Sequence, residues 1–252
     1  MHQRRAAARS DHLRAVLLLA GIILPLAPSA ARACDDRSVL ANAAVGITRM
    51  FDETEKQDLA GVAGSGWFLA PRLLVTVAHV ADGMRLSERE WKPVLFRDGD
   101  TVETIDVRLQ RIVGTGPEKI ALIETAAPLG GTRPLELRKE PLLAEERVIS
   151  RAYRSDRVRT AQGRFVEYGK QGRFAGGALF EIYDGNDRMA LDHGASGAPV
   201  LDCSGRVVAV VANLLTQTMR LPAGQVRFST AWSMPNVLTV PVQVLHESGE
   251  IN

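Results

Sequence analysis

The chain is poor in cysteine and in aromatic side chains, and it lacks a long apolar segment. Its two cysteines allow at most one internal disulfide, and a chain of 252 residues can bury a full core without such a cross-link. Aromatic residues make up 5% and are not interleaved with basic ones, which argues against binding of single-stranded nucleic acid. The apolar run at 15–27 falls short of the roughly 20 residues that a membrane-spanning helix needs. Histidines and cysteines do not have metal-ligand spacing, so we expect neither a metal nor a cofactor.

Residues 1–33 have the layout of a secretory signal peptide. A basic segment precedes the apolar run, and Ala31 and Ala33 stand three and one positions before Cys34. Small residues at these two positions are typical of a leader cleavage site. We expect cleavage after Ala33 and a mature chain of residues 34–252 that is secreted or periplasmic and no longer held at a membrane. The alternative, a single membrane anchor, is disfavoured by the shortness of the run.

The leader also accounts for the positive net charge. The whole chain has 31 Lys and Arg against 29 Asp and Glu, and residues 1–33 hold five of the arginines and one of the aspartates. The mature part therefore has 26 basic and 28 acidic side chains, a net charge of −2. Nothing in this balance calls for a nucleic-acid partner. In an oxidising compartment, Cys34 and Cys203 could form one disulfide or remain two thiols.

Short apolar runs separated by Gly, Pro and Asp dominate the chain from residue 43 onward. The expected strands are VAGSGWFLA, RLLVTVAHV, KPVLFRD, TIDVRLQRIVG and KIALIET, then RVISRAY, RFVEYG, ALFEIYD, APVLD, RVVAVVANLL and QVRFSTAWSM. Strands this short with turns this frequent indicate an all-β sandwich or barrel. NVLTVPVQVLHE has helical character, and Pro241 limits a helix there to residues at or after the proline. The segment AAPLGGTRPLELRKEPLLAEE separates two bodies, which we place at about 40–128 and about 144–240.

Two segments carry residue types suited to nucleophilic acyl transfer, which needs an activated nucleophile, a base and donors for the oxyanion. In GASGAP, flanking glycines let the backbone turn tightly and expose the Ser196 hydroxyl. Alone, this motif is also compatible with an ordinary turn. In LLVTVAHV, His79 ends an apolar strand, as a general base or as a buried core residue. His193 and His246 are the other histidines of the mature chain, and His79 is the one expected on a rigid strand.

Three segments together resemble the trypsin-like serine protease family of chymotrypsin fold, including its exported bacterial members. GSGWFLAPRLLVTVAHV resembles the segment that ends in the catalytic histidine, and KIALIET resembles the strand that opens with the triad aspartate. GASGAPVLDCSGRVVAVV resembles the nucleophile loop and the hairpin after it. The three segments occur in the family's order over about residues 60–240. The resemblance implies an all-β fold of two six-stranded Greek-key β-barrels with a short C-terminal helix, and an exported serine endopeptidase with protein or peptide substrates.

The resemblance also implies roles for single residues. Ser196 would attack the scissile carbonyl, His79 would take its proton, and the N–H groups of Gly194 and Ser196 would hold the oxyanion. Uncharged side chains would line the pocket for the residue before the cleaved bond, which implies a small or apolar preference. The expected lining residues are Ala190, Leu191, Val211, Ala212 and Asn213, with His193 at the rim, where the alternative is an exposed loop residue.

The chain departs from the family where the triad acid is expected. That position, immediately before the Ile-Ala-Leu run, is Lys119, and Glu118 precedes it. Because neighbouring strand residues point to opposite faces, Glu118 reaches His79 only if the preceding loop bulges. Other carboxylates that could replace it are Asp98, Asp100 and Asp106. A lysine that faces His79 would disfavour its imidazolium form.

Three functions therefore stay open. A serine endopeptidase would explain why Ser196 and His79 both stand where the family needs them. A catalytically weak or inactive module that keeps the peptide groove is the second, and Lys119 is its main support. A non-proteolytic esterase that uses the same pair is the third, and no residue favours it.

Overall fold

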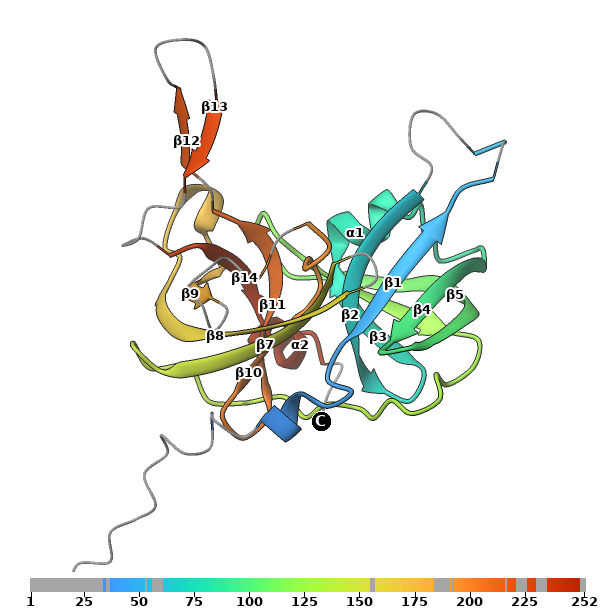
Figure 1. The fold of residues 1–252 in the computed structure, drawn as a ribbon, viewed down its shortest axis with the longest axis horizontal. Coiled ribbons are helices and arrows are strands. Elements are labelled where there is room, and N and C mark those ends of the chain that lie inside the picture. The colour runs from blue at the N-terminus through green and yellow to red at the C-terminus, as the bar shows by residue number, and fades with distance from the viewer. Residues whose placement is uncertain are drawn as a thin grey trace, which may run out of the picture.

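The computed structural model describes residues 34, 37–52, 54–55, 61–154, 157–183, 191, 193–215, 217–220, 226–229 and 235–249. In these ranges the chain forms two closed six-stranded barrels that lie side by side (Figure 1). The expected all-β architecture of two Greek-key barrels is confirmed. The signal peptide expected at residues 1–33 lies outside the described residues.

The first barrel has the strand order β1-β2-β3-β6-β5-β4, with antiparallel pairs, and it closes between β1 and β4. Its strands are β1 (Val45–Met50), β2 (Gly61–Ala70), β3 (Leu73–Val77), β4 (Lys92–Asp98), β5 (Thr101–Val113) and β6 (Ile120–Thr125). The sequence analysis did not identify β1. Its pattern is broken by Arg49, which is buried and donates a hydrogen bond to the carbonyl of Met84 at 2.8 Å.

The second barrel repeats this strand order when its last strand is counted as the sixth. Its strands are β7 (Arg147–Arg154), β8 (Arg157–Tyr168), β9 (Ala178–Tyr183), β10 (Pro199–Asp202), β11 (Val207–Leu214) and β14 (Val237–Pro241). A two-stranded sheet of β12 (Gln217–Arg220) and β13 (Val226–Ser229) is inserted before β14 and projects from the barrel (Figure 1). The short C-terminal helix is confirmed as α2 (Gln243–Glu247), which begins after Pro241. The described residues also include helix α1 (Ala78–Gly83) and the 3-10 turns η2 (Arg37–Leu40) and η3 (Gly172–Phe174).

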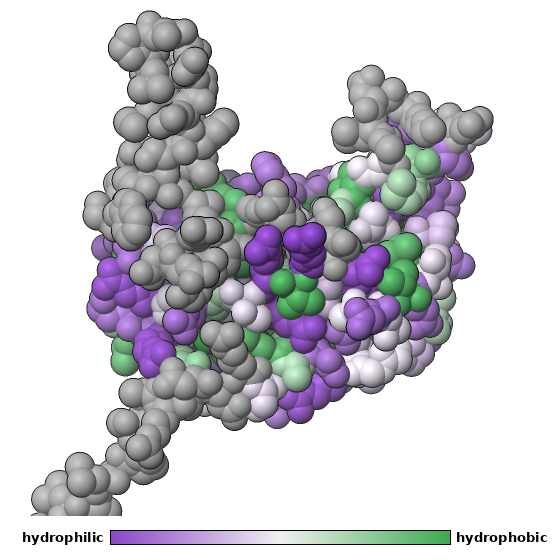
Figure 2. Space-filling view, viewed as in Figure 1, coloured by the Kyte–Doolittle hydropathy of each residue, from purple (hydrophilic) through white to green (hydrophobic). Residues whose placement is uncertain are grey.

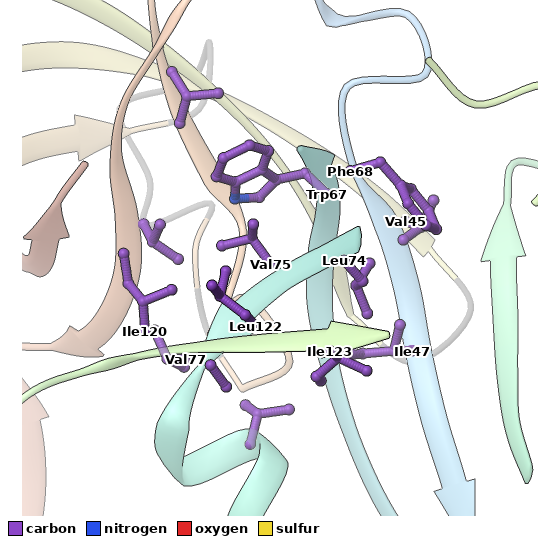
Figure 3. Packing of buried hydrophobic residues seen from close by; sticks show 14 of the residues in the cluster. Val45, Ile47, Trp67, Phe68, Leu74, Val75, Val77, Ile120, Leu122 and Ile123 are labelled. Carbon is purple, nitrogen blue, oxygen red and sulfur yellow. The ribbon is translucent and has the colours of Figure 1, made fainter. Parts of the chain in front are cut away.

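The core explains why β6 reads as an uninterrupted apolar run. Ile120, Ala121, Leu122 and Ile123 are each at most 1% exposed, so both faces of the strand are buried. Figure 3 shows this packing: Leu122 and Ile123 of β6 lie among side chains of β1, β2 and β3. The same cluster continues into the second barrel, where its members include Val207, Val210 and Ala212 of β11. The burial of one such aliphatic side chain stabilises the fold by about 1.5–3 kcal/mol.

The segment between the barrels is fixed to both of them by backbone hydrogen bonds. The Leu135 N–H donates to the carbonyl of Phe68 in β2 at 2.8 Å, and the Arg138 N–H donates to the carbonyl of Val207 in β11 at 2.9 Å. The Val207 N–H donates in return to the Glu136 carbonyl at 2.8 Å. This segment is therefore a brace between the barrels as well as their connection.

The first described residues are attached to the second barrel before the chain enters the first. A disulfide joins Cys34 to Cys203, across a sequence separation of 169 residues. Arg151 of β7 donates a hydrogen bond to the carbonyl of Leu40 at 2.9 Å. Of the two states left open for the cysteines, the structure has the disulfide.

The face in Figure 2 is largely hydrophilic, with apolar residues in small separate groups on its coloured part. Large exposed apolar side chains lie singly on different elements, such as Met50 at the end of β1 and Val158 on β8. Among the described residues, no helix has the length and hydropathy needed to cross a membrane.

Candidate active site

His79 lies on the first turn of a short helix, which corrects the expectation that it ends a strand. Strand β3 stops at Val77, and the Ala78 N–H still donates to the Lys119 carbonyl at 2.8 Å, as in the β3–β6 ladder. The chain then winds into α1 (Ala78–Gly83), which buries Val80 and Ala81 and leaves the His79 side chain 44% exposed. The strand pattern was misleading here because AHVADG is short and alternates in polarity much as a strand does.

Ser196 lies in a tight turn just before β10. Gly194 and Gly197 flank it with φ angles of 100° and 91°, values that favour glycine. A Cβ at Gly197 would stand 2.0 Å from the Ser65 carbonyl oxygen, so the turn has no room for a larger residue there. The Gly197 N–H donates to the Val211 carbonyl at 2.8 Å, which ties the turn to β11.

Gly64 of β2 places the histidine helix and the serine turn next to each other. A Cβ on Gly64 would come within 2.8 Å of the Val80 side chain and 3.3 Å of the Ser196 carbonyl oxygen. Helix α1 belongs to the first barrel and the turn to the second, so both pack on one glycine where the barrels meet. The fold thus brings His79 and Ser196 to the same region of the seam.

The Ser196 hydroxyl donates a hydrogen bond to the carbonyl of Ala212 at 3.2 Å. Among the described residues, its hydrogen-bond partner is this carbonyl and not the ring of His79. At 3.2 Å the O–H···O bond is longer than the usual range of about 2.5–3.0 Å. A rotation about one side-chain bond would release the hydroxyl toward the seam.

Glu118 lies beside His79, although the family's position for the acid is Lys119. The Oε2 atom of Glu118 is 3.7 Å from Nδ1 of His79, and Oε1 accepts a hydrogen bond from the side chain of Asn213. The Glu118 side chain is 23% exposed, whereas the Lys119 side chain is exposed to solvent. Glu118 lies in the bend before β6 rather than in the strand, so strand alternation does not decide its direction, and its carboxylate is the one in contact with the histidine.

The other candidate acids lie elsewhere. Asp98, the last residue of β4, accepts hydrogen bonds from Arg151 at 3.3 Å and from Tyr153 at 3.4 Å. Asp100 and Asp106 are exposed, in the β4–β5 turn and on β5. Among the described residues, Glu118 is the carboxylate that forms an ion-pair contact with His79.

The residues expected to line the substrate pocket fall into two groups. Leu191, Val211 and Ala212 are at most 1% exposed and belong to the apolar core. His193 and Asn213 are exposed. Ala190 lies outside the described residues.

Part of the backbone of the serine turn donates no hydrogen bond to another described residue. Among the hydrogen bonds between described residues, the turn's donors are the N–H groups of Gly197 and Ala198, and neither Gly194 nor Ser196 donates. The N–H groups of Gly194 and Ser196 are the two that the resemblance implies for the oxyanion.

Ser65 is a residue of the site that the sequence analysis missed. It is fully buried in β2; its hydroxyl donates to the Gly194 carbonyl at 2.8 Å and accepts from the Tyr153 N–H at 2.9 Å. Its own N–H donates to the Ser196 carbonyl at 2.8 Å. One residue of the first barrel thus holds the serine turn at two points, through its hydroxyl at Gly194 and through its backbone N–H at Ser196. The motif GSG was the available signal, since a serine between two glycines of a buried strand adds little apolar burial.

The described residues contain no group of three His, Cys, Asp or Glu side chains placed to bind a metal ion. The polar groups that the fold brings to this region are a hydroxyl, an imidazole, a carboxylate and backbone N–H groups. This set matches the parts of nucleophilic acyl transfer.

Comparison with known proteins agrees with this arrangement. A solved structure of the Rv3671c protease from M. tuberculosis in its active form has a TM-score of 0.56 at 15% identity, over 96% of this chain and 92% of that chain. The inactive form of the same protease gives a TM-score of 0.53 at 16% identity, over 84% and 89%. Deg5 gives 0.55 at 14% identity, over 88% and 94%. These likenesses concern the fold. Among curated protein sequences, no relative matches significantly.

A sequence model of the trypsin-like peptidase domain matches residues 64–210, more than half of the chain. The match begins at Gly64, which supports both α1 and the serine turn, and it includes His79, Glu118 and Ser196. The chain therefore belongs to the trypsin-like peptidase family.

Proposed function

We propose that the protein is an exported serine endopeptidase that cleaves peptide bonds through an acyl-enzyme on Ser196. His79 is the general base, Glu118 is the acid of the triad, and the N–H groups of Gly194 and Ser196 bind the oxyanion. The observation that carries the proposal is the contact between Glu118 Oε2 and Nδ1 of His79, at 3.7 Å, on the seam where Ser196 lies.

This contact assigns the two nitrogens of the imidazole. With Nδ1 turned to the carboxylate, Nε2 is the nitrogen available to Ser196. When a substrate carbonyl enters, the hydroxyl leaves the Ala212 carbonyl, its oxygen bonds to the carbonyl carbon, and its proton passes to Nε2. The imidazolium then gives this proton to the leaving amine as the C–N bond breaks. Water attacks the acyl-enzyme by the same route, releases the acid and restores the hydroxyl.

Two features of the geometry around His79 and Ser196 support this sequence of steps. The 3.7 Å between carboxylate and imidazole is longer than a hydrogen bond, and catalytic contacts of this kind often shorten only when substrate binds. The serine turn, in contrast, is held from two sides by Ser65 and by the Val211 carbonyl. Backbone N–H groups held in a fixed turn suit a transition state that develops charge on the carbonyl oxygen.

Export is supported by the leader and by the disulfide. A disulfide between Cys34 and Cys203 forms and persists in an oxidising compartment such as a periplasm or the exterior of a cell. Cleavage after Ala33 would make Cys34 the first residue of the mature protein. Expression of the full chain in a secreting host, followed by mass measurement of its N-terminal peptide, tests this: a start at Cys34 supports export, and an intact leader on soluble protein counts against it.

The activity is tested by peptide hydrolysis. The purified protein is incubated with a mixed peptide library, beside Ser196→Ala and His79→Ala, and products are identified by mass spectrometry. Cleavage of internal bonds by the native protein, lost in both variants, supports a serine endopeptidase. Cleavage that persists in Ser196→Ala would come from another source and would overturn the assignment.

A peptide-binding module without turnover is the second outcome of this experiment. It was favoured by Lys119, an exposed residue next in sequence to the carboxylate that contacts His79. A native protein that binds library peptides, shown by their co-elution, without cleaving them would establish this function instead.

A further inference from the structure

Strand β11 contains an irregularity directly behind the serine turn. Its pairing with β14 shifts between Val211 and Asn213, so Ala212 is an extra residue opposite the neighbouring strand. A bulge of this kind re-aims the side chains on either side of it. Here the Ala212 carbonyl accepts from the Ser196 hydroxyl, and the next side chain, Asn213, turns outward across the seam.

Asn213 reaches the acid rather than a pocket. Its Nδ2 group donates a hydrogen bond to Oε1 of Glu118, which lies in the other barrel and 95 residues away in sequence. The carboxylate thus uses one oxygen for Asn213 and presents the other to His79. A carboxylate held through one oxygen has its second oxygen fixed in direction, which a partly exposed glutamate on a loop would otherwise lack.

The loop that carries Glu118 meets the second barrel at a second point. A Cβ on Gly116 would stand 2.8 Å from the Ala175 carbonyl oxygen, and a Cβ on Gly176 would stand 3.7 Å from the Gly116 Cα. The loop between β5 and β6 therefore packs against the turn around η3. Asn213 adds a polar contact to this packing, and this contact is made to the Glu118 carboxylate itself.

We propose that Asn213 is a positioning residue that holds Glu118 against His79 across the barrel interface, and that it is not a specificity residue of the substrate pocket. The inference rests on the proposed function, because the value of the contact lies in the His79–Glu118 pair. It differs from the pocket role that the resemblance implied for Asn213.

A double-mutant cycle distinguishes the two roles. Asn213→Ala is expected to lower kcat about tenfold with little change in KM, the loss of one hydrogen bond to a charged group. In a Glu118→Gln background the same substitution is expected to change kcat by less than about twofold, because its partner carboxylate is gone. An equal loss in both backgrounds, or a loss confined to KM, would overturn the proposal in favour of a pocket role. Glu103→Gln, an exposed carboxylate on β5, is the matched control for charge removal.

A spectroscopic cycle keeps this result separate from the proposed function. In the Ser196→Ala protein, nitrogen NMR of the His79 ring is recorded with and without Asn213→Ala. The Nδ1 signal is expected to move on Asn213→Ala and to stay in place when the same change is made in Glu118→Gln. If the native protein cleaves no peptide but the signal moves as described, the proposed function fails and the positioning stands. If the signal does not respond, the positioning role is refuted whatever the activity.

Discussion

Replacement of Glu118 by glutamine removes the negative charge beside His79 and keeps the size of the side chain. In the proposed mechanism the imidazole becomes a cation, so the carboxylate would stabilise the transition state more than the ground state. We therefore expect Glu118→Gln to lower kcat and to change KM little.

The magnitude follows from the geometry. At the 3.7 Å between the two groups, the Coulomb energy of two unit charges is roughly 4.5 kcal/mol for an effective dielectric constant of 20 and roughly 1.1 kcal/mol for that of water. The side chains of His79 and Glu118 are 44% and 23% exposed, so solvent screening brings the value toward the lower end. A net effect of about 1.4–2.8 kcal/mol corresponds to a loss of about 10- to 100-fold in kcat. This is smaller than the roughly 10⁴-fold loss known for a buried triad aspartate.

The assay is steady-state hydrolysis of the best library peptide by the native protein, Glu118→Gln and Lys119→Gln. Lys119 contributes a backbone carbonyl to the site and an exposed side chain, so its variant is expected to stay within about twofold of the native kcat. A loss below about twofold for Glu118→Gln, or a large gain on removal of the lysine charge, would refute the assignment of the acid.

Three further changes test other parts of the structure. Gly197→Ala places a Cβ 2.0 Å from a backbone oxygen at a φ of 91°, so urea unfolding should show a loss of more than about 1 kcal/mol together with loss of activity; an unchanged midpoint would contradict the crowding. Replacement of Cys34 and Cys203 by serine opens a loop of 169 residues, and the melting temperature should fall by the equivalent of about 2–5 kcal/mol; the native protein in reductant should melt with the double variant. Burial raises the pKa of Glu146, but the hydrogen bonds and charges around it, chiefly those of Arg138, lower it by more. The pKa therefore lies below its ordinary value of 4.5. Because the folded pKa is the lower one, its stabilisation is present above pH 4.5 and lost as the pH falls below it; Glu146→Gln should flatten this part of the stability profile, and a difference from native that is independent of pH would contradict it.

Much of the fold could be predicted because the buried strands are recognisable from their runs of apolar residues. The run Ile120–Ile123 is apolar without interruption because both faces of β6 are covered, and the glycines around Ser196 reflect a turn that has no room for side chains. Pro241 likewise marks the boundary between β14 and α2. In these places local chemistry and tertiary structure demand the same residues.

The remaining features depend on contacts between distant segments. Arg49 makes β1 hard to recognise, because a buried arginine interrupts its apolar pattern and one of its donors binds the carbonyl of Met84, a partner that no local pattern reveals. Helix α1 is one turn long, too short for a helical period to appear. Ser65 and Asn213 gain their importance from residues more than 90 positions away in sequence, at Gly194 and Glu118.

The carboxylate beside His79 is the clearest case of a feature that sequence position alone does not identify. Counting from the Ile-Ala-Leu run leads to Lys119, and only the direction of the side chains shows that Glu118 faces the histidine. A glutamate one position earlier is one methylene longer than an aspartate, and its reach compensates for part of the difference in backbone position.

The central claim is that Ser196 is a nucleophile activated by His79, and covalent labelling tests it most directly. The native protein, Ser196→Ala and His79→Ala are treated with a fluorophosphonate, and the modified peptide is identified by mass spectrometry. We expect a single adduct on Ser196 in the native protein, no adduct in Ser196→Ala and a strongly slowed reaction in His79→Ala. A folded native protein that forms no adduct, or labelling of Ser196 at the same rate without His79, would contradict it.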